Sequence, residues 1–194
     1  YSGVYSNDFF YKFINSNLKR KKKIKKIIEI GSNDLYLLKK FYKKAKNLIG
    51  IDPSHINIKK NTKYKKIKTI KEFFYNVNTR RLGNDVDLII SGHTLEHVED
   101  PEKFIKRILL ISNNETKVFF QFPSSDSLVS NLSFDQIQHQ HLNYFSLKSF
   151  NKIIEKCRGK IINYAYNDSH YGALMVYFTL NSSKQKNEKK IKIQ

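Results

Sequence analysis

Two short segments place a glycine turn and an acidic residue at a spacing that suits a nucleoside ligand. Residues 28–34 read Ile-Glu-Ile-Gly-Ser-Asn-Asp, and residues 48–54 read Leu-Ile-Gly-Ile-Asp-Pro-Ser. Both begin with apolar runs that predict buried strands, so Gly31 and Asp52 are expected at strand ends. The turn after a first parallel strand offers backbone N–H groups and a helix N-terminus, and an acid after the next strand can accept both ribose hydroxyls. Together they predict a nucleoside cofactor.

The turn indicates which class of nucleoside is bound. A dinucleotide site needs Gly-x-Gly-x-x-Gly, because the backbone must approach a pyrophosphate closely. Only Gly31 is present here, with Asn33 and Leu35 where further glycines would stand. Asn tolerates left-handed backbone angles, so Asn33 can still form the turn. Without a pyrophosphate cradle or a Gly-Lys-Ser/Thr run, a cofactor that lacks phosphates fits better, and S-adenosylmethionine is the common one.

With these motifs the chain resembles the class I S-adenosylmethionine-dependent methyltransferases. Residues 91–101, Ser-Gly-His-Thr-Leu-Glu-His-Val-Glu-Asp-Pro, look like that family's segment after the fourth strand. Residues 134–146, Phe-Asp-Gln-Ile-Gln-His-Gln-His-Leu-Asn-Tyr-Phe-Ser, are similar to the branch that methylates a carbon of nucleotide-linked keto-sugars. The resemblance spans residues 26 to 180. It implies S-adenosylmethionine as cofactor, S-adenosylhomocysteine as product and a small-molecule acceptor, an anionic nucleotide-sugar.

The hydrophobic pattern supplies the elements that would position these motifs. It predicts strands at residues 24–30, 48–51, 65–68, 86–91 and 117–122, and a closing antiparallel pair at 160–167 and 173–180. It predicts helices at 8–18, across the cofactor cleft, and at 35–46, 71–75, 101–111 and 147–157. The expected fold is α/β, a Rossmann-like parallel sheet with helices on both faces and a terminal antiparallel hairpin, as in class I methyltransferases. Every motif then falls at the carboxyl end of a strand, where such sheets bind ligands.

Length and composition are consistent with one domain. The chain has 194 residues and 40% hydrophobic residues, and no run of eighteen apolar residues that would span a membrane. Residues 1–181 are expected to form the methyltransferase domain, with an N-terminal helix and basic linker over 1–23, and 182–194 a charged, disordered tail. Cys157 is the single cysteine, which excludes an intramolecular disulfide and a multi-cysteine zinc site. Sugar C-methyltransferases of this type usually carry an N-terminal cysteine-rich zinc domain, which this sequence lacks.

The chain starts at Tyr1, without a signal-peptide pattern, and is expected to be a cytoplasmic fragment or processed form. Its formal net charge of +19 allows two classes of partner. Clustered lysines would attract nucleic-acid phosphates, yet positive potential near the cleft serves an anionic nucleotide-sugar equally well. Nucleic acid is the less favoured acceptor, and the sequence leaves the oligomeric state open.

The motifs and the resemblance give specific roles to side chains. Asp52 is the predicted ribose acceptor, or else a turn residue before Pro53. Asp34 is an alternative helix cap, Phe73 and Phe74 are equally good core residues, and His97 is expected to be structural. The residues predicted to bind the cofactor are Glu29, Gly31, Ser32, Asn33, Asp52, Pro53, Glu72, Phe73, His93 and Thr94.

Methylation of a carbon beside a ketone requires a base, and histidine titrates in a suitable range. The resemblance points to His141 as this base, with His139 beside it. The family commonly has Tyr-His-Glu-His where this chain has Gln138-His139-Gln140-His141. The missing tyrosine and carboxylate leave the acceptor, and C- versus O-methylation, open. The alternative for both histidines is a loop role, hydrogen bonding to backbone.

Two other classes of function stay open. A nucleic-acid methyltransferase would use the same cofactor half, although the Asn/Asp-Pro-Pro-Tyr/Phe motif and paired catalytic cysteines are absent. A cofactor-binding remnant could instead act as a non-catalytic partner module. No metal site is predicted, because His, Asp and Glu do not recur at ligand spacing with cysteine support.

Overall fold

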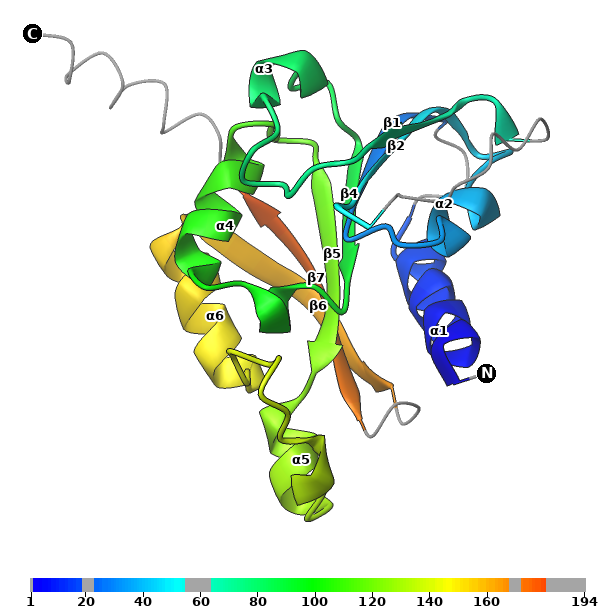
Figure 1. Ribbon diagram of the computed structural model, residues 1–194. Helices are drawn as coiled ribbons and strands as arrows, with labels where there is room; N and C mark the ends of the chain where they lie inside the picture. Colours follow the sequence, from blue (N-terminus) through cyan, green and yellow to red (C-terminus); the bar gives the residue numbers. More distant parts are fainter. Residues whose placement is uncertain (1, 19–22, 55–63, 168–171, 181–194) are drawn as a thin grey trace, which may run out of the picture.

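The strands form one seven-stranded sheet in the order β3-β2-β1-β4-β5-β7-β6 (Figure 1). The computed structural model describes residues 2–18, 23–54, 64–167 and 172–180. The first five strands are parallel, and β7 runs antiparallel to both β5 and β6. The strands are β1 Ile24–Ile30, β2 Ala45–Ile51, β3 Ile67–Ile70, β4 Leu88–Gly92, β5 Lys117–Pro123, β6 Gly159–Asn167 and β7 Ala173–Leu180.

Helices cover both faces of the sheet, with α1 and α2 on one face and α4 and α6 on the other (Figure 1). Aspartate and serine caps define where the longer helices start. Asp100 accepts the Lys103 N–H ahead of Pro101, and Ser146 shares a reciprocal pair of hydrogen bonds with Ser149. The helices are α1 Ser2–Ser16, α2 Tyr36–Lys40, α3 Thr79–Leu82, η2 Leu95–His97, α4 Pro101–Leu109, α5 Ser125–Ser130, η3 Phe134–Gln136 and α6 Leu147–Lys156.

Alternation along the strands divides the core into two layers. In β5, Phe120 and Phe122 pack in the layer under α4 and α6, whereas Phe119, which precedes them, packs in the layer under α1 and α2. Ile27 and Ile28 of β1 divide in the same way. Because successive strand side chains point to opposite faces, these unbroken apolar runs fit strands covered on both sides.

The predicted α/β architecture is therefore confirmed, including the terminal antiparallel hairpin. Three predicted helices differ from the structure. The helix predicted over 8–18 spans Ser2–Ser16. The helix predicted over 35–46 ends at Lys40, because Ala45 already pairs with Ile24 as the first residue of β2. The helix predicted over 71–75 is wrong: a turn closed by Asn76 N–H to Phe73 O occupies this segment, and a short helix starts only at Thr79.

Some predictions concern residues outside the described ranges. These are the tail over 182–194 and residues 19–22 of the basic linker. Within the described residues, no helix is both long and apolar enough to span a membrane.

Candidate active site

A cavity of about 960 Å³ opens beside the carboxyl ends of the parallel strands. All ten residues predicted to bind the cofactor line it. They come from β1 and the turn after it, from the residues after β2, from the segment after β3 and from the residues after β4. Ser6 and Asn7 add a wall from α1, which confirms that the N-terminal helix borders the cleft. The parallel sheet therefore brings the two original sequence motifs to one site.

The turn after β1 depends on left-handed backbone at three positions. Gly31 has φ 74°, Asn33 has φ 38° and Leu35 has φ 65°. The first two were predicted from residue type, whereas Leu35 is a residue that rarely adopts this conformation. Asp34 accepts the Tyr36 N–H at 3.0 Å, so it contributes to the start of α2 although Leu35 holds the cap position. The resulting turn keeps the Gly31 backbone close to Thr94.

Asp52 both supports the turn and faces the cavity. Its side chain is 8% exposed, and it accepts the Asn33 N–H at 2.9 Å and the Ser54 N–H at 2.8 Å. The bond to Ser54 is the turn role that was the alternative to ligand binding. The bond to Asn33 joins the end of β2 to the glycine turn, and the carboxylate also lines the cavity, where a hydroxyl donor could approach it. The two roles are compatible.

Glu29 is a buried carboxyl group in the wall of the cavity. Its side chain is 4% exposed and its Oε2 atom has no hydrogen-bond partner among the described residues. Burial raises the pKa of Glu29 well above its ordinary value of 4.5, although a backbone hydrogen bond from Leu38 opposes the shift. A positively charged ligand group beside Glu29 would favour its ionised form.

Phe73 and Phe74, which the sequence could not separate, have different environments. Both border the cavity, but Phe73 is 63% exposed, whereas Phe74 is 4% exposed and packs edge-on against Phe104 in the core. Phe73 is therefore available to a planar ligand group, and Phe74 is structural.

A buried polar cluster beneath His93 was not predicted. Gln121 Nε2 lies 3.0 Å from Ser6 Oγ and 2.7 Å from His93 Nε2, and Asn167 Nδ2 donates to the Ser6 carbonyl at 3.3 Å. His93 has φ 50°, a left-handed angle that is uncommon for this residue. Gln121 and Asn167 lie in strands that read as ordinary sheet segments, so only their tertiary contacts reveal the cluster. It fixes the ring of His93 at the cavity.

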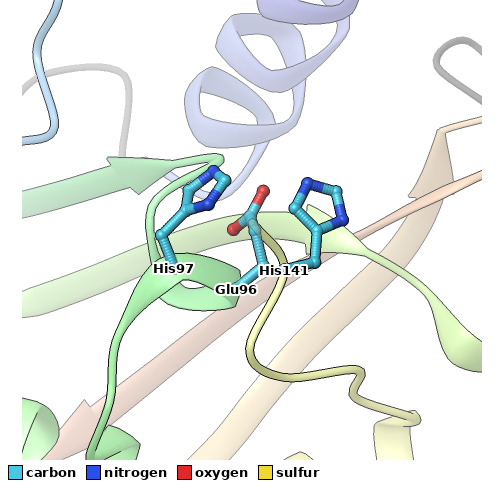
Figure 2. A group of neighbouring side chains, drawn as sticks. All are labelled: Glu96, His97 and His141. Carbon is cyan, nitrogen blue, oxygen red and sulfur yellow. The ribbon is translucent and has the colours of Figure 1, made fainter. Parts of the chain in front are cut away.

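A second cavity, of about 420 Å³, shares His93 and His97 with the first. Its lining includes Glu96 and His141. The His97 and His141 rings meet edge-on with centroids 5.1 Å apart, and Figure 2 shows them on either side of the Glu96 carboxylate. Burial lowers the pKa of His141, and the nearby Glu96 carboxylate opposes this shift. His139 is solvent-exposed and lines neither cavity, so the structure separates the two histidines predicted to act together.

The sequence also matches a known family. A family model described as a methyltransferase domain matches residues 6–157. The chain belongs to this methyltransferase family. The match covers the residues that line both cavities except Gly172, and the strand order agrees with the class I arrangement that the resemblance implied.

Individual relatives agree with this assignment. The methyltransferase is 23% identical over 158 residues to a protein named C-methyltransferase NovU from Streptomyces niveus. That match covers 78% of this chain and 36% of the relative, so the chain spans about a third of the length of the curated relative that it matches.

Solved structures share the fold. N-methyltransferase NodS from Bradyrhizobium japonicum WM9 superposes with a TM-score of 0.70 at 13% identity, over 91% of this chain and 97% of that chain. Magnesium protoporphyrin IX methyltransferase from Synechocystis PCC 6803, solved with bound SAH, gives 0.68 at 8% identity, over 93% and 84%.

The cavity fits S-adenosylmethionine, the cofactor of this class of methyltransferase. Asp52 can accept ribose hydroxyls, the exposed Phe73 can contact the adenine, and the buried carboxyl of Glu29 suits the positively charged methionine part. A Cβ atom on Gly31 would lie only 1.9 Å from Thr94 Oγ1, so the turn is as close to the fourth-strand segment as side chains allow. The cofactor would supply a sulfonium methyl group, and the residues around it bind and orient it.

Proposed function

We propose that this methyltransferase transfers the methyl group of S-adenosylmethionine to a small-molecule acceptor, an anionic nucleotide-linked or related sugar. The observation that carries the proposal is the shared wall of the two cavities. His93 and His97 line both, so a methyl donor in the larger cavity and an acceptor in the smaller one would meet there. Methyl transfer is in line from sulfur to the nucleophile, so adjacent and aligned sites supply much of the catalysis.

Three observations favour a sugar acceptor. Residues 134–146 resemble the nucleotide-sugar branch of the family, and part of this segment lines the second cavity. The relative NovU is named a C-methyltransferase. The net charge of +19 would attract the pyrophosphate of a nucleotide-sugar. A cytoplasmic location, and a choice of carbon over oxygen as the methylated atom, stay predictions.

Within this site we infer that His141 acts on the acceptor. Its ring lies at the second cavity beside Glu96, whereas His139, two residues earlier, points into solvent outside both cavities. The pair therefore offers a matched comparison. We expect His141→Ala to lower the rate of methyl transfer by at least about 100-fold, the usual contribution of a positioned catalytic group, and His139→Ala to leave it nearly unchanged.

The test is transfer of labelled methyl from S-adenosylmethionine to a panel of nucleotide-sugars, with bulk RNA as a parallel acceptor. Label on a nucleotide-sugar, lost in His141→Ala and kept in His139→Ala, supports the proposal. Label on RNA alone, declining steeply with salt, would show a nucleic-acid methyltransferase. Cofactor binding without transfer to either acceptor would favour the non-catalytic partner module.

A further inference from the structure

Three potential metal ligands gather at the second cavity, although they are not spaced as a metal motif in the sequence. Glu96 and His97 belong to η2, and His141 comes from the loop before α6 (Figure 2). One ligand atom from each lies within 4.8 Å of the other two. The group went unpredicted because Glu96 and His97 are neighbours in the chain and His141 is supplied by a distant loop.

Two of the three side chains have buried polar atoms that lack partners. Glu96 is 2% exposed, and its Oε2 atom has no hydrogen bond within the described residues. The same is true of the buried Nδ1 atom of His141. Buried polar atoms nearly always have a partner, which can be protein, water or an ion. Two such atoms in one cluster indicate that something binds between them.

The hydrogen bonds around the cluster leave lone pairs available to an ion. His97 Nδ1 lies 2.8 Å from the Gln140 carbonyl, which accepts only if Nδ1 carries the proton, so in the neutral ring Nε2 is the atom that can bind an ion. His93 Nε2 accepts from Gln121, so His93 Nδ1 carries the proton and faces Glu96 Oε1 at 3.3 Å. Metal-binding histidines and carboxylates are typically oriented by such outer hydrogen bonds.

We propose that Glu96, His97 and His141 bind a divalent transition-metal ion, of the zinc or iron(II) class. Two imidazoles and one carboxylate suit these ions, whereas magnesium and calcium prefer all-oxygen sites. Three protein ligands leave at least one position open, as catalytic metal sites do. All three side chains line the second cavity, so an oxygen atom of an acceptor bound there could complete the coordination.

The site itself rests only on the geometry, while its role rests on the proposed function. A bound cation would hold and polarise an acceptor oxygen next to the methyl donor. His141 would then act on the acceptor through the ion, which replaces the free-base role predicted from the sequence. Glu96, in η2, would take the place of the carboxylate that the family commonly has where this chain has Gln140.

The test is direct metal binding by the chelator-treated chain, without cofactor or acceptor. Titration with Co²⁺ is followed by visible absorption, and titration with Zn²⁺ by calorimetry. We expect one ion per chain, with affinity lowered at least about 100-fold in Glu96→Gln and in His141→Ala, since even loss of an outer-shell partner costs 10- to 100-fold. His139→Ala is the matched control and should bind normally, because His139 is exposed and outside the cluster.

Circular dichroism and thermal melts establish that each variant is folded. Absence of binding by the folded parent chain overturns the metal site and leaves the proposed methyl transfer untouched. If His141→Ala and His139→Ala weaken metal binding equally, the proposed metal site is also overturned. Conversely, metal binding by the predicted ligands in a chain that methylates no sugar would keep the site and refute the proposed function.

Discussion

Substitution of Gly31 by alanine tests whether the turn after β1 is held against the fourth-strand segment. The new Cβ atom would lie 1.9 Å from Thr94 Oγ1 and 3.1 Å from Thr94 Cβ, at a residue with φ 74°. The left-handed angle costs an alanine roughly 1–2 kcal/mol, and relief of such an overlap in a packed site typically costs about 1–3 kcal/mol. We therefore expect Gly31→Ala to lower the free energy of unfolding by roughly 2–5 kcal/mol.

Gly92→Ala is the matched control, because Gly92 lines the same cavity. A Cβ atom there would meet Phe10 Cε1 at 3.6 Å, an ordinary van der Waals contact. This variant should change the unfolding free energy by less than about 1 kcal/mol. Urea denaturation followed by circular dichroism measures both variants, and calorimetry with S-adenosylhomocysteine measures the effect on the cavity.

A double variant identifies the source of the loss. Thr94→Ala alone removes hydroxyl contacts to the Ile30 and Gly92 carbonyls, at 3.4 and 3.2 Å, which is worth about 1 kcal/mol. Combined with Gly31→Ala it also removes the 1.9 Å overlap, so the double variant should be more stable than additivity predicts by roughly 1–3 kcal/mol. Additive losses, or a Gly31→Ala chain as stable as Gly92→Ala, would refute the close approach.

Three further changes test the walls of the cofactor cavity. Asp52→Ala should weaken S-adenosylhomocysteine binding by roughly 10²- to 10⁴-fold in calorimetry, because two hydrogen bonds to a charged group are lost at about 1.5–3 kcal/mol each; wild-type affinity would exclude a ribose contact. The raised pKa of Glu29 means that the folded chain binds this proton more tightly than the unfolded chain. The unfolding free energy of the wild type should therefore rise relative to that of Glu29→Gln as pH falls from neutral towards 4.5. Parallel curves of stability against pH for the two proteins would contradict the burial argument. Phe74→Ala should cost about 3–5 kcal/mol of unfolding free energy, whereas Phe73→Ala should leave stability nearly unchanged and weaken cofactor binding; equal stability losses would refute the assignment of Phe73 to the cavity.

The sequence predicted those parts of the structure that depend on local pattern. Strand β1 was predicted with its observed bounds because Ile24–Ile30 is rich in isoleucine and is followed by a turn-forming glycine. Pro101 similarly marked the start of α4. The cavity around Gly31 and Asp52 followed from strand ends meeting at one edge of a parallel sheet.

Features that depend on contacts between distant segments were not predicted. Two adjacent phenylalanines after β3 suggested a helix, but Phe74 is buried by a turn while Phe73 stays outside. The partnership of Glu96 with His141 has no periodic or spacing signal, because η2 and the loop before α6 meet only in the folded chain. His139 and His141 were predicted together, whereas the loop directs the two histidines to different surroundings.

The polar cluster under His93 joins the two ends of the domain. Ser6 lies near the start of the chain and Asn167 in the last hairpin, and both hold Gln121, which contacts the ring of His93. During synthesis, the wall shared by the two cavities therefore stays incomplete until the final strands have emerged and α1 has docked. A partly made chain could form the glycine turn but could not yet hold His93 in place, so a complete site arises only in a complete domain.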